Sequence, residues 1–163
     1  MAGTVESVGA DLLAQRALVE PASRALVVAG VSASEWGEPV IRREARLAVE
    51  DDAELLVVHV NVADGFAHRR SQMLDRYRDL TVEQGGTYTE IDGDAPADGL
   101  AAAARAGRAS RVVVARHRSR LGELARGSVA SRLRRLLPDA TVDEVRGAIG
   151  PAGADELESP PKH

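Results

Sequence analysis

The sequence contains no cysteine, which excludes disulfide scaffolds, thiolate nucleophiles and cysteine-ligated metal centres. It also has only four aromatic residues: Trp36, Phe66, Tyr77 and Tyr88. The hydrophobic core must therefore be built mainly from Val, Leu, Ala and Ile. At 163 residues the chain is long enough for one domain with a sizeable core.

Long apolar runs are missing as well. The longest uncharged apolar stretch is far too short to cross a bilayer. The first residues, Met-Ala-Gly-Thr-Val-Glu, lack the basic region followed by an apolar stretch that is typical of a signal peptide. We therefore expect a cytoplasmic protein with no membrane contact.

Positive charge is unevenly distributed along the chain. The formal net charge of −4 argues against a general affinity for nucleic acid. Residues 101–137 nevertheless contain ten arginines and one glutamate, an excess of nine positive charges. The rest of the chain is correspondingly acidic, so any anionic partner is expected to meet this one region.

Short apolar runs alternate with helical stripes. We expect strands at residues 24–29, 54–60, 87–91, 111–115 and 141–145, and helices at residues 38–50, 66–84, 96–107 and 121–137. Strands alternating with helices indicate an α/β fold with a mostly parallel sheet and right-handed crossovers.

The two ends of the chain differ from this middle part. Residues 1–20 are expected to form an N-terminal amphipathic helix, because their apolar residues follow one helical stripe: Val5, Val8, Leu12, Leu13 and Ala17. This helix can pack on the domain itself or join a partner such as a second copy. Residues 147–163, rich in Gly, Pro and Glu, predict a disordered tail. Residues 21–146 remain as the α/β domain.

The loop after the strand at residues 111–115 carries the most distinctive chemistry. It contains Arg116, Arg118 and Arg120, and Gly127 and Ser128 follow. Loops at the carboxyl ends of parallel strands form the ligand sites of α/β sheets. Guanidinium groups and exposed backbone N–H groups suit phosphate. These five residues therefore predict an anion or nucleotide site.

Hydroxyl groups follow the first predicted strand, at Ser32 and Ser34. They can reach a ligand phosphate or ribose from the same edge of the sheet. Alternatively, they are turn-forming and helix-capping residues, which such loops favour. His59, alone in an apolar strand, is typical of a hydrogen-bonded core residue. Neither a catalytic triad nor a metal-ligand spacing is present in the sequence, so we assign no catalytic or metal residue.

Several segments, in their order and spacing, resemble the universal stress protein family. They include Gly30-Val-Ser-Ala-Ser, Glu54-Leu-Leu-Val-Val-His-Val and Leu124-Ala-Arg-Gly-Ser-Val. More narrowly, the chain is similar to the universal-stress-type domain of the KdpD potassium sensor kinases. The resemblance covers residues 24–146. It implies a Rossmann-like open sheet of five parallel strands in the order 3-2-1-4-5, with helices on both faces.

The family's ATP-binding members share a pattern of two spaced glycines followed by Gly-Ser or Gly-Thr. Here Val114 and His117 occupy the first two glycine positions, and only Gly127-Ser128 matches. Some KdpD-type domains bind cyclic di-AMP through a Ser-x-Ser motif, which Ser32-Ala33-Ser34 matches. The resemblance therefore implies ATP or cyclic di-AMP as candidate ligands.

The function implied by the resemblance is a non-enzymatic regulatory domain that senses a nucleotide or another anionic ligand in stress or potassium signalling. A homodimer or a sensor kinase is the implied partner, although Asp143 and Glu144 discourage pairing through the fifth strand. The alternatives are an ATP-binding universal stress protein with slow hydrolysis, and a ligand-free module that binds a protein through its Arg-rich face.

Overall fold

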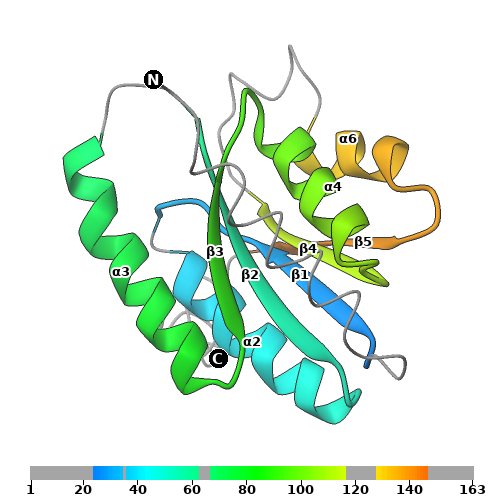
Figure 1. Cartoon of the computed structure of the whole chain (residues 1–163), viewed down its shortest axis with the longest axis horizontal. Helices are drawn as coiled ribbons and strands as arrows, with labels where there is room; N and C mark the ends of the chain where they lie inside the picture. The colour runs from blue at the N-terminus through cyan, green and yellow to red at the C-terminus, as the bar shows by residue number, and fades with distance from the viewer. Residues whose placement is uncertain (1–23, 35, 63–66, 117–127, 147–163) are drawn as a thin grey trace, which may run out of the picture.

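The computed structural model describes residues 24–34, 36–62, 67–116 and 128–146. Its five strands form one parallel sheet in the order β3-β2-β1-β4-β5 (Figure 1). The strands are β1 (Leu26–Gly30), β2 (Glu54–Asn61), β3 (Thr87–Asp92), β4 (Arg111–Arg116) and β5 (Thr141–Arg146). The five predicted strands and their order are confirmed.

Four helices of the described part cover the sheet: α2 (Gly37–Glu50), α3 (Ala67–Glu83), α4 (Pro96–Ala106) and α6 (Val129–Leu136). Helices α2 and α3 lie on one face, and α4 and α6 lie on the other (Figure 1). The structure is therefore the predicted Rossmann-like α/β fold with helices on both faces.

Strand β2 shows why the central strands lack polar alternation. Its residues 55–60 are all buried. Leu56 and Val58 pack in the core under α4 and α6, whereas Leu55 and Val57 pack in the core under α2 and α3. A strand covered on both faces needs apolar residues at successive positions.

The helix predicted over residues 121–137 is interrupted at Ser128, and its part before that residue lies outside the described residues. Helix α6 begins at Val129, because Ser128 has an extended backbone (φ −70°, ψ 153°) and acts as its N-cap. The Ser128 hydroxyl accepts a hydrogen bond from the Ser131 N–H at 3.1 Å. A serine that bonds the third amide ahead of it starts a helix rather than continuing one.

Other predictions lie outside the described residues. These are the N-terminal helix at residues 1–20, the tail at 147–163 and the loop at 117–127. Within the described ranges, no helix combines the length and the apolar character needed to cross a membrane.

A buried ion pair joins α2 to β4. The side chain of Glu44 is only 1% exposed, and its carboxylate lies 3.0 Å from Arg43 Nη1 and 3.5 Å from Arg111 Nη2. Burial raises the pKa of Glu44 above its ordinary value of 4.5, and the two arginines offset part of that rise. Folding therefore favours the protonated form of this carboxyl group.

This raised pKa makes the stability of the fold depend on pH. The Glu44 contribution is fully present below pH 4.5, its unfolded value, and is lost as pH rises through the folded-state pKa. We expect Glu44→Gln to become more stable relative to the wild type as pH is raised from about 4 to about 7. Urea unfolding measures this, with Glu50→Gln, exposed on the same helix, as the control. A difference between Glu44→Gln and the wild type that stays constant with pH would contradict the assignment.

Candidate functional site: the carboxyl edge between β1 and β4

The order of the strands reverses between β1 and β4. From β1 the chain passes outward to β2 and β3, then returns to β4 on the other side of β1. Gly30, which ends β1, pairs with Val114 near the end of β4. The two strands thus end at one edge of the sheet. Such a reversal leaves a crevice at the carboxyl ends of the strands, where ligands of open α/β sheets bind.

The segment after β1, residues 31–34, is hydrogen-bonded to β2 through Val31. The Val31 N–H donates to the Val58 carbonyl at 3.0 Å. His59, 6% exposed, lies 2.9 Å from the Val31 carbonyl through Nδ1. Because a carbonyl only accepts, Nδ1 carries the hydrogen. The prediction that His59 is a hydrogen-bonded core residue is confirmed.

Ser32 and Ser34 lie together in this segment, both half-buried. Their hydroxyl oxygens are 3.1 Å apart, and the Ser34 N–H donates to the Ser32 carbonyl at 2.7 Å. The turn-forming interpretation is therefore confirmed. Neither serine caps α2, because Trp36 occupies the N-cap position without a side-chain hydrogen bond. Ligand binding by the two hydroxyls stays a prediction.

The arginine part of the predicted site is described only at its start. Arg116 is the last residue of β4, and its backbone pairs with that of Arg146 on β5. Arg118, Arg120 and Gly127 lie outside the described residues. Ser128 is described, and its hydroxyl is 2.9 Å from that of Ser131 besides capping α6.

Two positions near the edge carry buried valines. Val114, at the position of the first glycine in the ATP-binding pattern, is buried in the core under α4 and α6. Val31, which follows Gly30, is buried in the opposite core. Neither side chain can offer a polar group to a ligand. At these two positions the edge therefore presents no polar side chain.

Tyr77 is a residue of this edge that sequence reasoning missed. It lies on α3, and its hydroxyl donates to the Ser34 carbonyl. Its spacing from Leu74 and Leu80 matches an apolar helical stripe, and this was the only available signal. No such stripe shows that the ring will reach a loop 43 residues earlier in the chain.

The described residues bring together no group of three or more His, Asp or Glu side chains that could hold a metal ion. The polar groups at the edge are hydroxyl and backbone groups, together with the arginines that the sequence adds. Arginine only donates and a hydroxyl can donate, so these side chains suit an anion better than a cation.

The universal stress protein family model matches residues 24–138, the greater part of this domain. The chain belongs to the universal stress protein family. Residues 24–138 run from the start of the sheet to the end of α6, so the match includes both segments at the carboxyl edge.

Known relatives agree with this assignment. The chain is 36% identical over 92 residues to the sensor protein KdpD of Mycobacterium tuberculosis. That stretch is 56% of this chain but only 11% of the length of the sensor protein.

Solved universal stress proteins share the fold. A crystal structure of one in complex with cAMP has a TM-score of 0.61 at 21% identity, over 78% of this chain and 100% of that one. Another, from Archaeoglobus fulgidus in complex with dAMP, has a TM-score of 0.50 at 20% identity, over 76% and 96%.

Because Ser128 caps α6, its loss should cost stability. We expect Ser128→Ala to lower the free energy of unfolding by about 1 kcal/mol. Ser131→Ala is the matched control, because it removes the hydroxyl contact but keeps the cap. Urea unfolding of both variants tests this expectation. Equal stability losses in the two variants would show that the cap contributes nothing.

Proposed function

We propose that this universal-stress-type domain is a regulatory, non-enzymatic module that binds a small nucleotide at the carboxyl edge between β1 and β4. The observation that carries the proposal is the register of the two strands. Gly30 pairs with Val114, so β1 and β4 end at the same edge of the sheet. Ser32-Ala33-Ser34 follows the first of these strand ends in the sequence, and the arginines from Arg116 on follow the second.

Charge supports an anionic ligand. Arg116 ends β4, and the sequence places Arg118 and Arg120 immediately after it. The N-terminus of α6, with its partial positive charge and capping Ser128, is directed to the same edge. In our proposal the arginines neutralise phosphate, Gly127 permits close approach of the backbone, and the three serines donate to the sugar or phosphate.

The relatives support the ligand class and the setting. Two universal stress proteins of the same fold were solved with cAMP and with dAMP, both adenine nucleotides. The match to KdpD favours a signalling role, so we propose a cyclic dinucleotide such as cyclic di-AMP as one ligand to test. ATP is the other, although Val114 fills the place of a phosphate-binding glycine.

Isothermal titration of the purified chain with cAMP, cyclic di-AMP and ATP tests the proposal. We expect at least one to bind with a dissociation constant below about 1 mM, roughly −4 kcal/mol. Arg116→Ala should weaken that binding about tenfold, because a hydrogen bond to a charged group contributes about 1.5 kcal/mol or more. Arg108→Ala is the matched control, because Arg108 lies before β4, at the opposite edge of the sheet.

The outcomes separate the alternatives. Binding that is weakened by Arg116→Ala and kept in Arg108→Ala supports the proposed site. Equal weakening in both variants would indicate general charge attraction and would contradict it. No binding of any of the three nucleotides would overturn the ligand proposal in favour of a protein-interaction module. ATP turnover to ADP during the titration would overturn the non-enzymatic role.

A further inference from the structure

We propose that Tyr77 is a positioning residue of this nucleotide site, holding residues 31–34 in place through its hydroxyl group. The hydrogen bond and the packing are observations of the structure. The effect on ligand affinity rests on the function proposed above.

Packing alone gives no reason for a hydroxyl at this position. Tyr77 is 2% exposed and lies in the core between α2, α3 and the sheet, with Ile41, Leu74 and Leu80. A phenylalanine ring would fill the same space. A buried tyrosine hydroxyl needs a hydrogen-bond partner, and here the partner is the Ser34 carbonyl. Burial also raises the pKa of Tyr77 above 10.0, so the group remains a neutral donor.

The first turn of α2 is shaped around the Tyr77 ring. A Cβ atom built on Gly37 would overlap that ring, so only glycine allows this close approach. The Gly37 N–H also donates to the Ser34 carbonyl, at 3.1 Å. Tyr77 therefore meets both the helix start and the loop before it.

Residues 31–34 are consequently fixed at both ends by side chains from other elements. His59 of β2 holds the carbonyl of Val31, and Tyr77 of α3 holds the carbonyl of Ser34. Between them lie Ser32 and the hydroxyl–hydroxyl contact at 3.1 Å. Two clamps that hold the backbone reduce the entropy that the segment would lose when a ligand binds.

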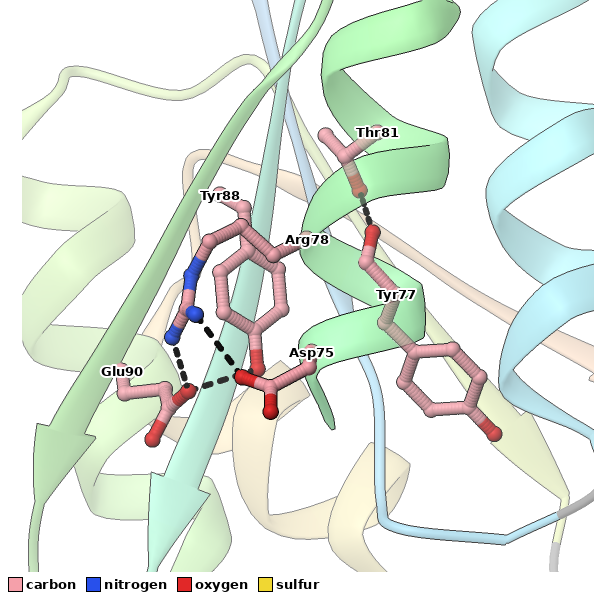
Figure 2. Close-up of polar contacts among 6 residues, drawn as sticks. All are labelled: Asp75, Tyr77, Arg78, Thr81, Tyr88 and Glu90. Atoms are coloured by element: carbon pink, nitrogen blue, oxygen red, sulfur yellow. Dashed lines mark hydrogen bonds and ion pairs between the residues drawn. The ribbon is translucent and has the colours of Figure 1, made fainter. Parts of the chain in front are cut away.

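The other tyrosine of the structure supplies a matched control. Tyr88 of β3 lies on the opposite side of α3 from Tyr77 (Figure 2). The Arg78 guanidinium lies 5.4 Å from the centre of the Tyr88 ring. The Tyr88 hydroxyl donates a hydrogen bond to the Glu90 carboxylate at 3.2 Å (Figure 2). Replacing Tyr88 with Phe deletes the same atom without touching residues 31–34.

The experiment compares Tyr77→Phe, Tyr88→Phe and the wild type by amide hydrogen exchange, nucleotide titration and thermal unfolding. For Tyr77→Phe we expect exchange in the peptide that contains residues 31–34 to become about fivefold faster, as for one lost hydrogen bond. Nucleotide affinity should fall by a similar factor of about five. Tyr88→Phe should change neither quantity, and both variants should unfold at similar temperatures.

Unchanged exchange at residues 31–34 in Tyr77→Phe would overturn the proposal. Faster amide exchange at residues 31–34 with unchanged nucleotide affinity would also overturn the proposal. The hydrogen bond from Tyr77 to Ser34 would then stabilise the fold without contributing to binding. If the wild type binds no nucleotide, the proposed function fails and the positioning role in binding fails with it. The exchange measurement still decides separately whether the Tyr77 hydroxyl holds the segment.

Discussion

The pairing of β1 with both β2 and β4 is the constraint on which the rest of this structure depends. Strand β1 is buried along its whole length, with Val28 and Ala29 fully inaccessible to solvent. The chain continues from β1 to β2 and β3 on one side of it, and then crosses to β4 and β5 on the other side. The two loops that flank the reversal, after β1 and after β4, therefore begin side by side. Every polar group proposed for the ligand site belongs to one of these loops, to the last residue of β4 or to the start of α6.

Much of the fold could be predicted because it follows from local patterns. Runs such as residues 54–60 and 111–115 are too short for helices and too apolar for exposed strands, so they predict buried parallel strands. The order of the strands came from the resemblance to the universal stress protein family, because the spacing of apolar residues predicts strands but not their order in a sheet. The location of Ser32, Ser34 and Arg116 at one edge followed from that order.

Contacts between distant residues could not be predicted in this way. The sequence gives no sign that Tyr77 reaches the Ser34 carbonyl, or that Glu44 is buried beside Arg111. Both depend on how α2 and α3 pack against the sheet. The interruption of the predicted helix at Ser128 was missed for a local reason. A serine can lie inside a helix or cap one, and only its backbone and its bond to Ser131 show which.

The ligand site that we propose is built from arginines and serine hydroxyls rather than from glycine-rich backbone. Val31 and Val114 are buried in the two cores, and Val114 stands where the ATP-binding pattern has its first glycine. Residues 31–34 are instead held by His59 from β2 and Tyr77 from α3. Affinity would then come from charge, and specificity from the fixed hydroxyls.

The central claim is that a nucleotide binds at the carboxyl edge of the sheet, beside β1 and β4. Amide chemical shifts in a ¹⁵N-labelled sample, followed while nucleotide is added, test it most directly. The account predicts that the shifts concentrate at residues 30–34 and 128–131, while residues 107–111 at the opposite edge stay unchanged. Shifts centred on residues 107–111, or spread evenly along the arginine-rich helix α6, would contradict it.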